Sequence, residues 1–370
     1  MSTKRLTVGI PAFKAENHIC DALASIQTQT LRGDVEVIIS VDNPGDDYGF
    51  VKERFPDLDI TILPCEKNTG PGLARQRALD ASTTPWITFM DADDVLFNPF
   101  SLEALMQGTS MIPNVIECQG VFFQEVVTPN PGNIRMMPRN DIGHPWVFGR
   151  LYNVKFLRDN EISFSELRAM EDGEFNWKIR MSIEGSPLRI QMIDAPIYLW
   201  RTGSEHSITR IGADDKDGIP QYNFDLCQWG ATEAAIRAVN FCRSRNPFNG
   251  GITRFTAETM VGQYYTYIEC LEKKPVFAEQ NLFNAKKFYH ECYKDIEHLI
   301  NDKTLKDIYT IQRTQKSQDI IGIIPQLSFF EFMDKVKNEE YRGDEEFQEI
   351  RSRLPEKVIE NDLKTGVLGK

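Results

Sequence analysis

Three carboxylates stand directly after a short apolar run, Trp86–Met90. The run predicts a buried strand because its residues are largely aromatic or β-branched and carry no charge. Asp91, Asp93 and Asp94 follow it at once. Carboxylates at a strand end are oxygen ligands suited to a hard divalent cation, and such a cation usually brings phosphate with it. The pattern predicts a metal-diphosphate site, and the alternative is a solvated acidic turn.

The elements around these carboxylates alternate between strand and helix. Strands are predicted at Leu6–Phe13, Val35–Val41 and Ile60–Leu63, and helices at Asn17–Gln29 and Leu73–Ala81. This alternation favours a parallel sheet with covering helices. In such a sheet Pro11, Asp42, Asn68 and Asp91 lie near the same edge, where α/β folds bind ligands. The order therefore predicts a nucleotide crevice.

The pattern changes after Phe100. Val115–Val127 predicts a longer strand, and Thr128–Asn140 predicts a loop because it is rich in Pro, Asn and Gly. Glu171-Asp172 opens a helix whose first turn is acidic, where the helix dipole favours negative charge. Ile197–Arg201 predicts another strand.

A helical region is predicted beyond a charged linker near Asp214–Gly218. Apolar residues recur at helical spacing over Asn223–Ser244, Phe255–Glu272 and Asn281–Ile300. The tail from about Glu345 is charged and predicts an exposed helix or partial disorder.

We therefore expect two domains. Residues 1–212 would contain a nucleotide-binding half, 1–100, and an acceptor half, 101–212. Residues 213–370 would form the helical C-terminal region.

Composition excludes several classes of protein. The net charge of −12 argues against a broad basic face for nucleic acid. No apolar run approaches the ~20 residues needed to cross a bilayer, and Met1–Arg5 leads into a strand without a signal-peptide core. The seven cysteines include no Cys-x-x-Cys pair, which predicts reduced thiols rather than a disulfide frame. We expect a cytoplasmic globular protein.

The motifs of residues 1–212, taken in order, resemble those of the family 2 glycosyltransferases, which have the GT-A fold. The matching segments are Ile10–Glu16, Val41–Asn43, Asn68–Gln76, Asp91–Asp94, Gly149–Tyr152, Glu171-Asp172 and His206–Arg210. The chain departs from the family pattern at three positions, with Lys14 and Gln76 where Asn is usual and Asn43 where Asp is usual. The resemblance implies an α/β fold with a GT-A type, Rossmann-like nucleotide-binding sheet.

The resemblance also implies an activity, the transfer of a sugar from a nucleotide-diphosphate sugar to an acceptor hydroxyl. The nucleotide would most often be UDP, and the acceptor a glycan, a cell-wall polymer, a protein or a modified nucleic-acid base. Negative charge builds on the leaving diphosphate, so Mn²⁺ or Mg²⁺ is the implied cofactor. The C-terminal helices would select the acceptor or form a homo-oligomer.

The implied metal ligands are Asp93 and His206, and Asp94 would either reach the metal or support the loop. Eight residues are implied in donor binding: Pro11, Phe13, Glu16, Asp42, Asn68, Arg75, Asp91 and Ala92. Among them, Asp42 would accept a hydrogen bond from the base and Asp91 would hold the ribose. The guanidinium group of Arg75 is always charged and has its donors in a fixed, forked arrangement, so it suits a diphosphate or ribose.

The resemblance implies Asp172, through the Glu171-Asp172 motif, as the general base that takes the proton of the attacking hydroxyl. Glu171 would orient substrate. One carboxylate in this place supports one in-line displacement, which predicts inversion of the anomeric configuration. Trp146, Trp177 and Trp200 could stack on a sugar, with core packing as the alternative.

The residues alone leave two other classes of protein possible. A nucleotidyltransferase typically has a glycine-rich loop after the first strand, but Pro11–Ala15 contains no glycine. A non-catalytic binding module on the same fold is the second alternative, and the intact Asp91, Asp93 and Asp172 argue against it.

Overall fold

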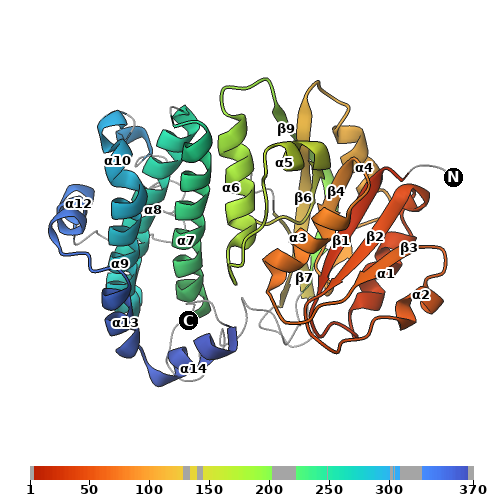
Figure 1. The fold of residues 1–370 in the computed structure, drawn as a ribbon, viewed down its shortest axis with the longest axis horizontal. Coiled ribbons are helices and arrows are strands. Elements are labelled where there is room, and N and C mark those ends of the chain that lie inside the picture. Colours follow the sequence, from red (N-terminus) through yellow and green to blue (C-terminus); the bar gives the residue numbers. More distant parts are fainter. Residues whose placement is uncertain are drawn as a thin grey trace. The chain divides into compact units, whose positions relative to one another are not determined.

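The computed structural model describes residues 4–127, 134–139, 145–201, 222–247, 249–300, 303, 305–308 and 327–365. These residues divide into two compact units (Figure 1). The first unit comprises the described residues of 1–167, 171–176 and 186–206, and the second comprises the remaining described residues. The predicted domain boundary after residue 212 lies outside the described residues and stays a prediction.

The first unit is built on a mixed nine-stranded sheet in the order β3-β2-β1-β4-β8-β6-β9-β5, with β7 paired to β6. The strands are β1 (Leu6–Ala12), β2 (Val35–Val41), β3 (Asp59–Leu63), β4 (Trp86–Phe89), β5 (Val95–Leu96), β6 (Val115–Val127), β7 (Ile134–Arg139), β8 (Arg150–Asn153) and β9 (Arg189–Trp200). Strands β1 to β4 are parallel to one another, as predicted, whereas β8 runs antiparallel to β4 and β6. The α/β fold class is confirmed.

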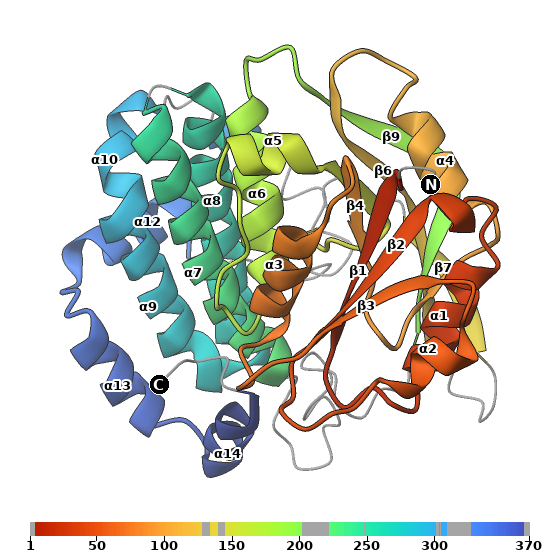
Figure 2. The ribbon, with the colours of Figure 1, turned by 45° about the vertical axis from the view of Figure 1, so that its right-hand side comes forward.

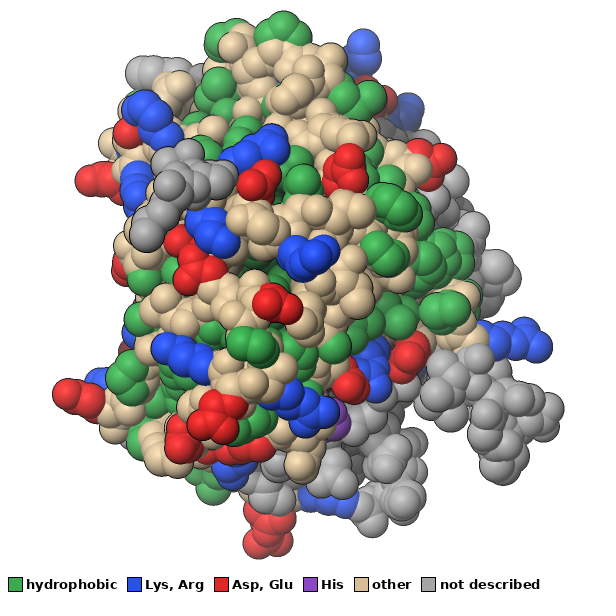
Figure 3. Space-filling model, turned by 90° about the vertical axis from the view of Figure 1, so that its right-hand side faces the viewer, with side chains coloured by type: hydrophobic (Ala, Val, Ile, Leu, Met, Phe, Trp, Pro, Cys, Tyr) green, Lys and Arg blue, Asp and Glu red, His purple; other side chains and the backbone are tan. Residues whose placement is uncertain are grey.

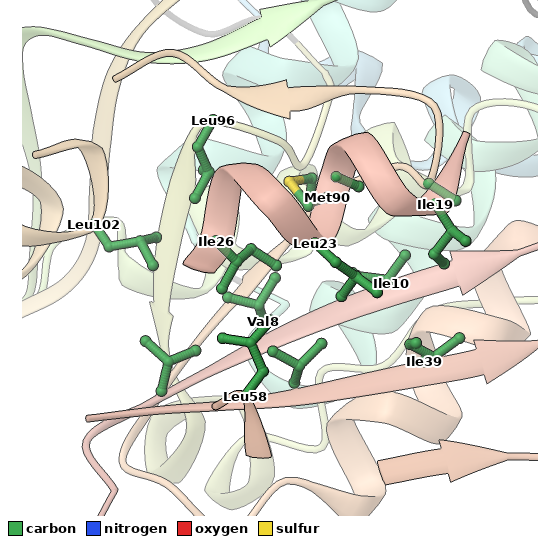
Figure 4. Close-up of a cluster of buried hydrophobic side chains, with 14 of the residues drawn as sticks. Val8, Ile10, Ile19, Leu23, Ile26, Ile39, Leu58, Met90, Leu96 and Leu102 are labelled. Carbon is green, nitrogen blue, oxygen red and sulfur yellow. The ribbon is translucent and has the colours of Figure 1, made fainter. Parts of the chain in front are cut away.

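The helices and short 3-10 turns of this unit connect the strands. They are α1 (Ile19–Gln27), η1 (Arg32–Asp34), α2 (Phe50–Arg54), α3 (Pro71–Ala81), α4 (Ser101–Gly108), α5 (Val154–Asp159) and the first half of α6 (Glu171–Ile183). Helix α1 buries Ile19, Leu23 and Ile26 in one cluster with residues of β1 such as Ile10 (Figure 4). Helix α3 packs on the opposite face of β1 (Figure 2), where a Cβ at Gly9 would lie 3.1 Å from Ala78 Cβ. Right-handed crossovers require this change of face when the chain returns from β3 to β4.

Two local predictions in the second half of the sheet were wrong. Ile134–Arg139, predicted as part of a loop, forms β7 and pairs antiparallel with Phe122–Val127 of β6. Strand β9 begins at Arg189 rather than at Ile197, because it pairs along β6. Both strands depend on a partner distant in sequence, and Pro138 is tolerated because β7 has β6 as its only partner among the described strands.

The second unit is helical, which confirms the predicted C-terminal helical region. Its elements are the second half of α6, α7 (Tyr222–Arg245), α8 (Gly250–Lys273), η2 (Pro275–Phe277), α9 (Ala278–Phe288), a π-helical turn (η3, Tyr289–Tyr293), α10 (Lys294–Ile296), η4 (Glu297–Leu299), α12 (Phe329–Asn338), α13 (Asp344–Ser352) and α14 (Glu356–Thr365). The charged tail is not merely exposed, because Phe347, Ile350 and Val358 are buried in a cluster with Trp229. The apolar residues spaced along this segment are therefore buried despite its many charged residues.

Figure 3 shows acidic and basic side chains interspersed across one face of the described residues rather than gathered by sign. Among the described residues, none of the helices combines the length and apolar character that a membrane crossing requires.

Candidate active site

The polar residues singled out in the first hundred positions meet at one edge of the sheet. Leu6 of β1 lies opposite both Val35 of β2 and Trp86 of β4, so the three parallel strands start together. Strands β1 and β2 also end together, at Ala12 and Val41, whereas β4 ends at Phe89, opposite Gly9. Phe13, Asp42 and Asp91 follow their carboxyl ends. This is the edge at which an open α/β sheet binds its ligand.

Asp42 is buried and fixes the loop that begins α3. Its Oδ1 accepts hydrogen bonds from the backbone N–H and the hydroxyl of Thr69, both at 2.9 Å, and its Oδ2 accepts from the N–H of Gly70 at 2.8 Å. The Asn68 amide donates to the Asp42 carbonyl at 2.8 Å. Gly70 has φ +90°, which only glycine adopts without strain. A nucleotide base would have to share the oxygens of Asp42 with this loop.

Arg77 is a site residue that the sequence analysis missed. Its guanidinium donates to the Thr69 hydroxyl at 2.8 Å and to the Val41 carbonyl at 2.6 Å, and it lies 3.6 Å from Asp42 Oδ1. It therefore braces the same loop from α3. No local signal distinguishes it from an arginine on a solvated helix face.

The turn after β1 is held by the turn after β2. Asp46 Oδ2 accepts from the N–H of Lys14 at 2.8 Å, and the Tyr48 hydroxyl accepts from the N–H of Ala15 at 3.0 Å. Asn43 donates to Asp46, so its side chain stabilises the turn. Lys14 has φ +49°, a left-handed conformation that Asn tolerates better, which explains why the departure from Asn at this position carries strain.

The remaining residues of this turn differ in exposure. Phe13 is 38% exposed, with the Lys14 ammonium 5.3 Å from its ring centroid. Glu16 is exposed and Pro11 is half-buried. Phe13 is thus an accessible aromatic ring at the edge beside Asp42.

Arg75 joins two carboxylates that are distant in sequence. One arm of its guanidinium donates to Glu171 Oε1 at 2.6 Å, and the other donates to Asp91 Oδ1 at 2.8 Å. Its side chain is only 7% exposed. Burial by itself lowers the pKa of Arg75, because it disfavours the charged form. The two carboxylates outweigh this effect and raise the pKa above its ordinary value. Both arms are therefore used to position carboxylates, so a direct contact with a diphosphate would require one of them to be exchanged.

Gly72 allows α3 to approach α6 closely enough for this pairing. A Cβ at Gly72 would lie 2.4 Å from the carbonyl oxygen of Ser165 and 2.9 Å from Cγ of Glu171. Any side chain would push the two segments apart. The glycine thus permits the contact between Arg75 and Glu171.

The acidic turn after β4 is held by β9. The Tyr198 hydroxyl donates to Asp94 Oδ2 at 2.7 Å and accepts from the backbone N–H of Asp91 at 3.0 Å, and the N–H of Arg201 donates to Asp94 Oδ1 at 2.7 Å. Asp94 is 1% exposed, and burial followed by the charges of Asp91 and Asp93 raises its pKa well above the ordinary value. Asp94 therefore supports the loop. Neither Tyr198 nor Arg201 was singled out in the sequence.

Within this turn the side chains differ in their access to solvent. Those of Asp91 and Asp93 are half-buried, whereas Ala92 is buried, at 5% exposure. Any contact of Ala92 with a ligand would thus come mainly through its backbone.

Asp172 stands beside Glu171 in the first turn of α6 and is half-buried. Its Oδ1 accepts from the N–H of Gly173 at 2.8 Å. Burial and then the charge of Glu171 raise the pKa of Asp172 to about 8. Met170, directly before the helix, has φ +66°, which is strained for a non-glycine residue. A carboxyl that titrates near neutral pH is suited to proton transfer.

Among the described residues, no group of three or more His, Cys, Asp and Glu side chains is arranged to hold a metal ion by itself. The predicted ligand His206 lies outside the described residues. Asp91 and Asp93 supply carboxylate oxygens, and a hard cation is commonly bound by one or two carboxylates together with substrate phosphates. The donor set therefore fits a divalent cation that is shared with a diphosphate.

The chain was compared with known proteins. The sequence model of the family described as "Glycosyl transferase family 2" matches residues 7–162. A glycosyltransferase of Streptococcus pneumoniae serotype 4, GlyA, is 33% identical over 24% of this chain and 13% of its own length. The amylovoran biosynthesis glycosyltransferase AmsB of Erwinia amylovora is 25% identical over 59% of this chain and 74% of its own length.

Another relative also has a solved structure. The poly(ribitol-phosphate) β-N-acetylglucosaminyltransferase TarS of Staphylococcus aureus is 23% identical over 54% of this chain and 36% of its own length. The aligned parts thus span less than two thirds of GlyA and of TarS. The crystal structure of TarS 1–349 in complex with UDP-GlcNAc superposes with a TM-score of 0.58 at 17% identity, covering 85% of this chain and 92% of that chain. This likeness shows a shared fold.

Replacing Arg75 should be far more destabilising than replacing an exposed arginine. Arg75→Gln leaves Glu171 buried without its counter-charge, so the free energy of unfolding should fall by about 3 kcal/mol. Arg5→Gln, which removes a half-exposed pair with Asp34, should cost less than about 1 kcal/mol. Urea unfolding measures both, and adding Glu171→Gln to Arg75→Gln should recover part of the loss. Equal losses in the two single variants would contradict this interpretation.

Proposed function

Residues 7–162 are a family 2 glycosyltransferase domain on a GT-A fold, and from this premise we propose an inverting enzyme that transfers a sugar from a UDP-sugar to an acceptor hydroxyl. The match to this family favours a glycosyltransferase over the nucleotidyltransferase and the non-catalytic module. The observation that carries the proposal is the Arg75 fork, because it ties the acidic turn after β4 to the helix that begins with Glu171 and Asp172.

The donor would lie along the carboxyl ends of β1, β2 and β4. Phe13 offers an accessible ring beside the Asp42 loop, which suits a base, and Asp91 would hold the ribose with its half-buried carboxylate. UDP is the proposed nucleotide because the structures of TarS, which share this fold, are described as complexes with UDP-GlcNAc and with UDP. Pro11, Glu16, Asn68 and Ala92 complete the proposed donor contacts.

Asp93, with Asp91 beside it, would hold the divalent cation, Mn²⁺ or Mg²⁺. Arg75 pairs with Asp91 and Glu171, and Asp172 has its pKa raised to about 8, so Asp93 is the carboxylate of the acidic turn proposed as the main metal ligand. A divalent cation there would stabilise negative charge on the leaving diphosphate. His206 remains a proposed further ligand.

Asp172 would act as the general base. The acceptor oxygen forms a bond to the anomeric carbon while the bond from that carbon to the β-phosphate oxygen breaks. The nucleoside diphosphate leaves with the electron pair, and Asp172 takes the proton of the acceptor hydroxyl. Glu171 is engaged by Arg75, so Asp172 rather than Glu171 is proposed to accept the proton. A single displacement inverts the anomeric configuration.

The first prediction from this proposal concerns Asp93. Wild-type protein should bind UDP at least 10-fold more tightly with Mn²⁺ than in excess chelator, as measured by isothermal titration calorimetry. Asp93→Ala should lose this metal-dependent gain and all transfer, because the cation would link the chain to the diphosphate. Asp57→Asn, which changes an exposed aspartate, serves as the control. Full UDP affinity of the wild type in chelator would refute the proposed metal site.

The second prediction concerns the general base. Asp172→Asn keeps the shape of the side chain but removes its basicity, so kcat should fall about 10²- to 10⁴-fold while UDP affinity stays unchanged. The wild-type kcat/KM should rise with pH and level off above about pH 8, because the base must be deprotonated. Asp159→Asn on an exposed aspartate is the matched control. Near-normal kcat in Asp172→Asn, or a retained anomeric configuration by NMR, would remove Asp172 from this role.

The third prediction links the same carboxyl to stability. In the folded chain Asp172 keeps its proton up to about pH 8, whereas in the unfolded chain it ionises near pH 4. Between these values the folded state binds more protons, so this group lowers stability as pH rises. Asp172→Asn should therefore raise Tm by roughly 2 °C or more at pH 8 and by much less at pH 4. Calorimetry at the two pH values tests this, and a gain that is larger at pH 4 would contradict it.

A further inference from the structure

Two tryptophans of the first unit lie together near the acidic turn. Trp146 and Trp200 are both partly buried, with ring centroids 5.7 Å apart and planes inclined by 49°. Each also contacts Phe148, at 5.8 Å and 6.0 Å between centroids. The third tryptophan considered above, Trp177, packs on Phe255 in the helical unit, consistent with a core role. Trp146 and Trp200 therefore form an indole pair that is separate from Trp177 and its cluster.

Strand β9 fixes Trp200 beside the acidic turn. Tyr198, two residues earlier and thus on the same face of the sheet, bonds through its hydroxyl to Asp94 and to the backbone of Asp91. Arg201, one residue later, bonds through its N–H to Asp94. Trp200 lies between these two attachments, so it stands next to the turn that carries Asp93.

Helix α6 fixes Trp146 relative to the general base. The Asn176 amide donates to the carbonyls of Pro145 at 2.6 Å and of Trp146 at 3.1 Å. Asn176 follows Asp172 by four residues, so the two lie on the same side of α6. The indole pair is thus tied on one side to the donor turn and on the other to the helix of Asp172, which is where an acceptor must bind.

The sheet adds uncharged polar and flexible groups to this face. Gln124 of β6 lies opposite Trp200 of β9, and Met137 of β7 lies opposite Gln124. Residues opposite one another in neighbouring strands share a face of the sheet. Met137 is 46% exposed and Gln124 is half-buried. These side chains and the two indoles carry no charge, and the charge described on the same face of β7 is that of the exposed Arg135, two residues from Met137.

We propose that Trp146 and Trp200, with Gln124 beside them, form the acceptor site and bind a neutral pyranose ring, so that the acceptor is a glycan. This inference rests on the proposed function. The two flat C–H faces of a pyranose fit against indole rings, and its hydroxyls fit the donor and acceptor groups of a glutamine amide. An open-chain polyol has the same hydroxyls but no ring face, so it should bind here weakly.

The test uses the full chain, UDP-sugar donors, and two classes of acceptor probe at matched concentration. The pyranose probes are methyl β-glucopyranoside, methyl β-galactopyranoside and methyl N-acetyl-β-glucosaminide, and the open-chain probe is ribitol. Wild type should transfer to at least one pyranoside and much less to ribitol. Trp146→Leu and Trp200→Leu should each raise the KM for that pyranoside about 10-fold, while hydrolysis of the donor without acceptor changes less than 2-fold.

Two variants act as controls. Trp146→Phe and Trp200→Phe keep an aromatic face and should recover most of the pyranoside affinity. Trp86→Leu removes a partly buried tryptophan at the opposite end of β4 and should leave the pyranoside KM unchanged. Since Trp86 belongs to the same hydrophobic cluster, it controls for a general loss of packing.

The outcomes separate this inference from the proposed function. Absence of UDP-sugar hydrolysis and of transfer in the wild type would overturn the proposed function and this inference with it. Donor hydrolysis with ribitol preferred to every pyranoside, or with no transfer to any pyranoside, would overturn the acceptor site alone. Unchanged pyranoside KM in both leucine variants would do the same.

Discussion

The buried guanidinium of Arg75 is the contact on which the arrangement of this site depends. It stands on α3, yet its two arms reach the end of β4 and the start of α6. A planar fork with fixed donor directions can hold two carboxylates at a set separation, which a lysine ammonium cannot do. The contact exists because Gly72 lets α3 lie against Ser165 and Glu171. The proposed donor residue Asp91 and the helical turn of the proposed base Asp172 thus share one positioning residue, Arg75.

Around this contact the chain gathers more carboxyl groups than Arg75 can pair with. Asp94 is buried against Tyr198 and Arg201, and Asp172 has its pKa raised to about 8 by burial and by Glu171. Such crowding is costly to the folded state, because each buried carboxylate loses hydration and repels its neighbours. For the proposed transferase this crowding would be useful, since it would provide a base that titrates near neutral pH and would attract a divalent cation.

Strand β9 and helix α6 also position the residues of the proposed acceptor site. Tyr198 and Arg201 fasten β9 to the acidic turn, and Asn176 fastens the segment of Trp146 to α6. The proposed acceptor groups are therefore placed by the same elements that place the acidic turn and Asp172. In this proposal rigid elements, rather than the side chains alone, would set the distance between donor and acceptor.

The sequence by itself determined the parallel half of the sheet, the helical C-terminal region and the acidic turn. Alternating strand and helix patterns are local, so β1 to β4 and the polar residues after them could be predicted within a few positions. The departures at Lys14 and Asn43 were also visible in sequence. The structural consequence of Lys14 was not visible in sequence. Its left-handed backbone conformation depends on the hydrogen bond from its N–H to Asp46.

Tertiary structure alone decided which of these residues touch. Arg75 and Glu171 are 96 residues apart, and Asp91 and Tyr198 are 107 apart, so no local pattern marks either pair. The same holds for β7, predicted as a loop, which forms because β6 offers it a partner strand. Periodicity reports how a segment buries its own apolar side, whereas the choice of a distant hydrogen-bonding partner depends on how the whole chain packs.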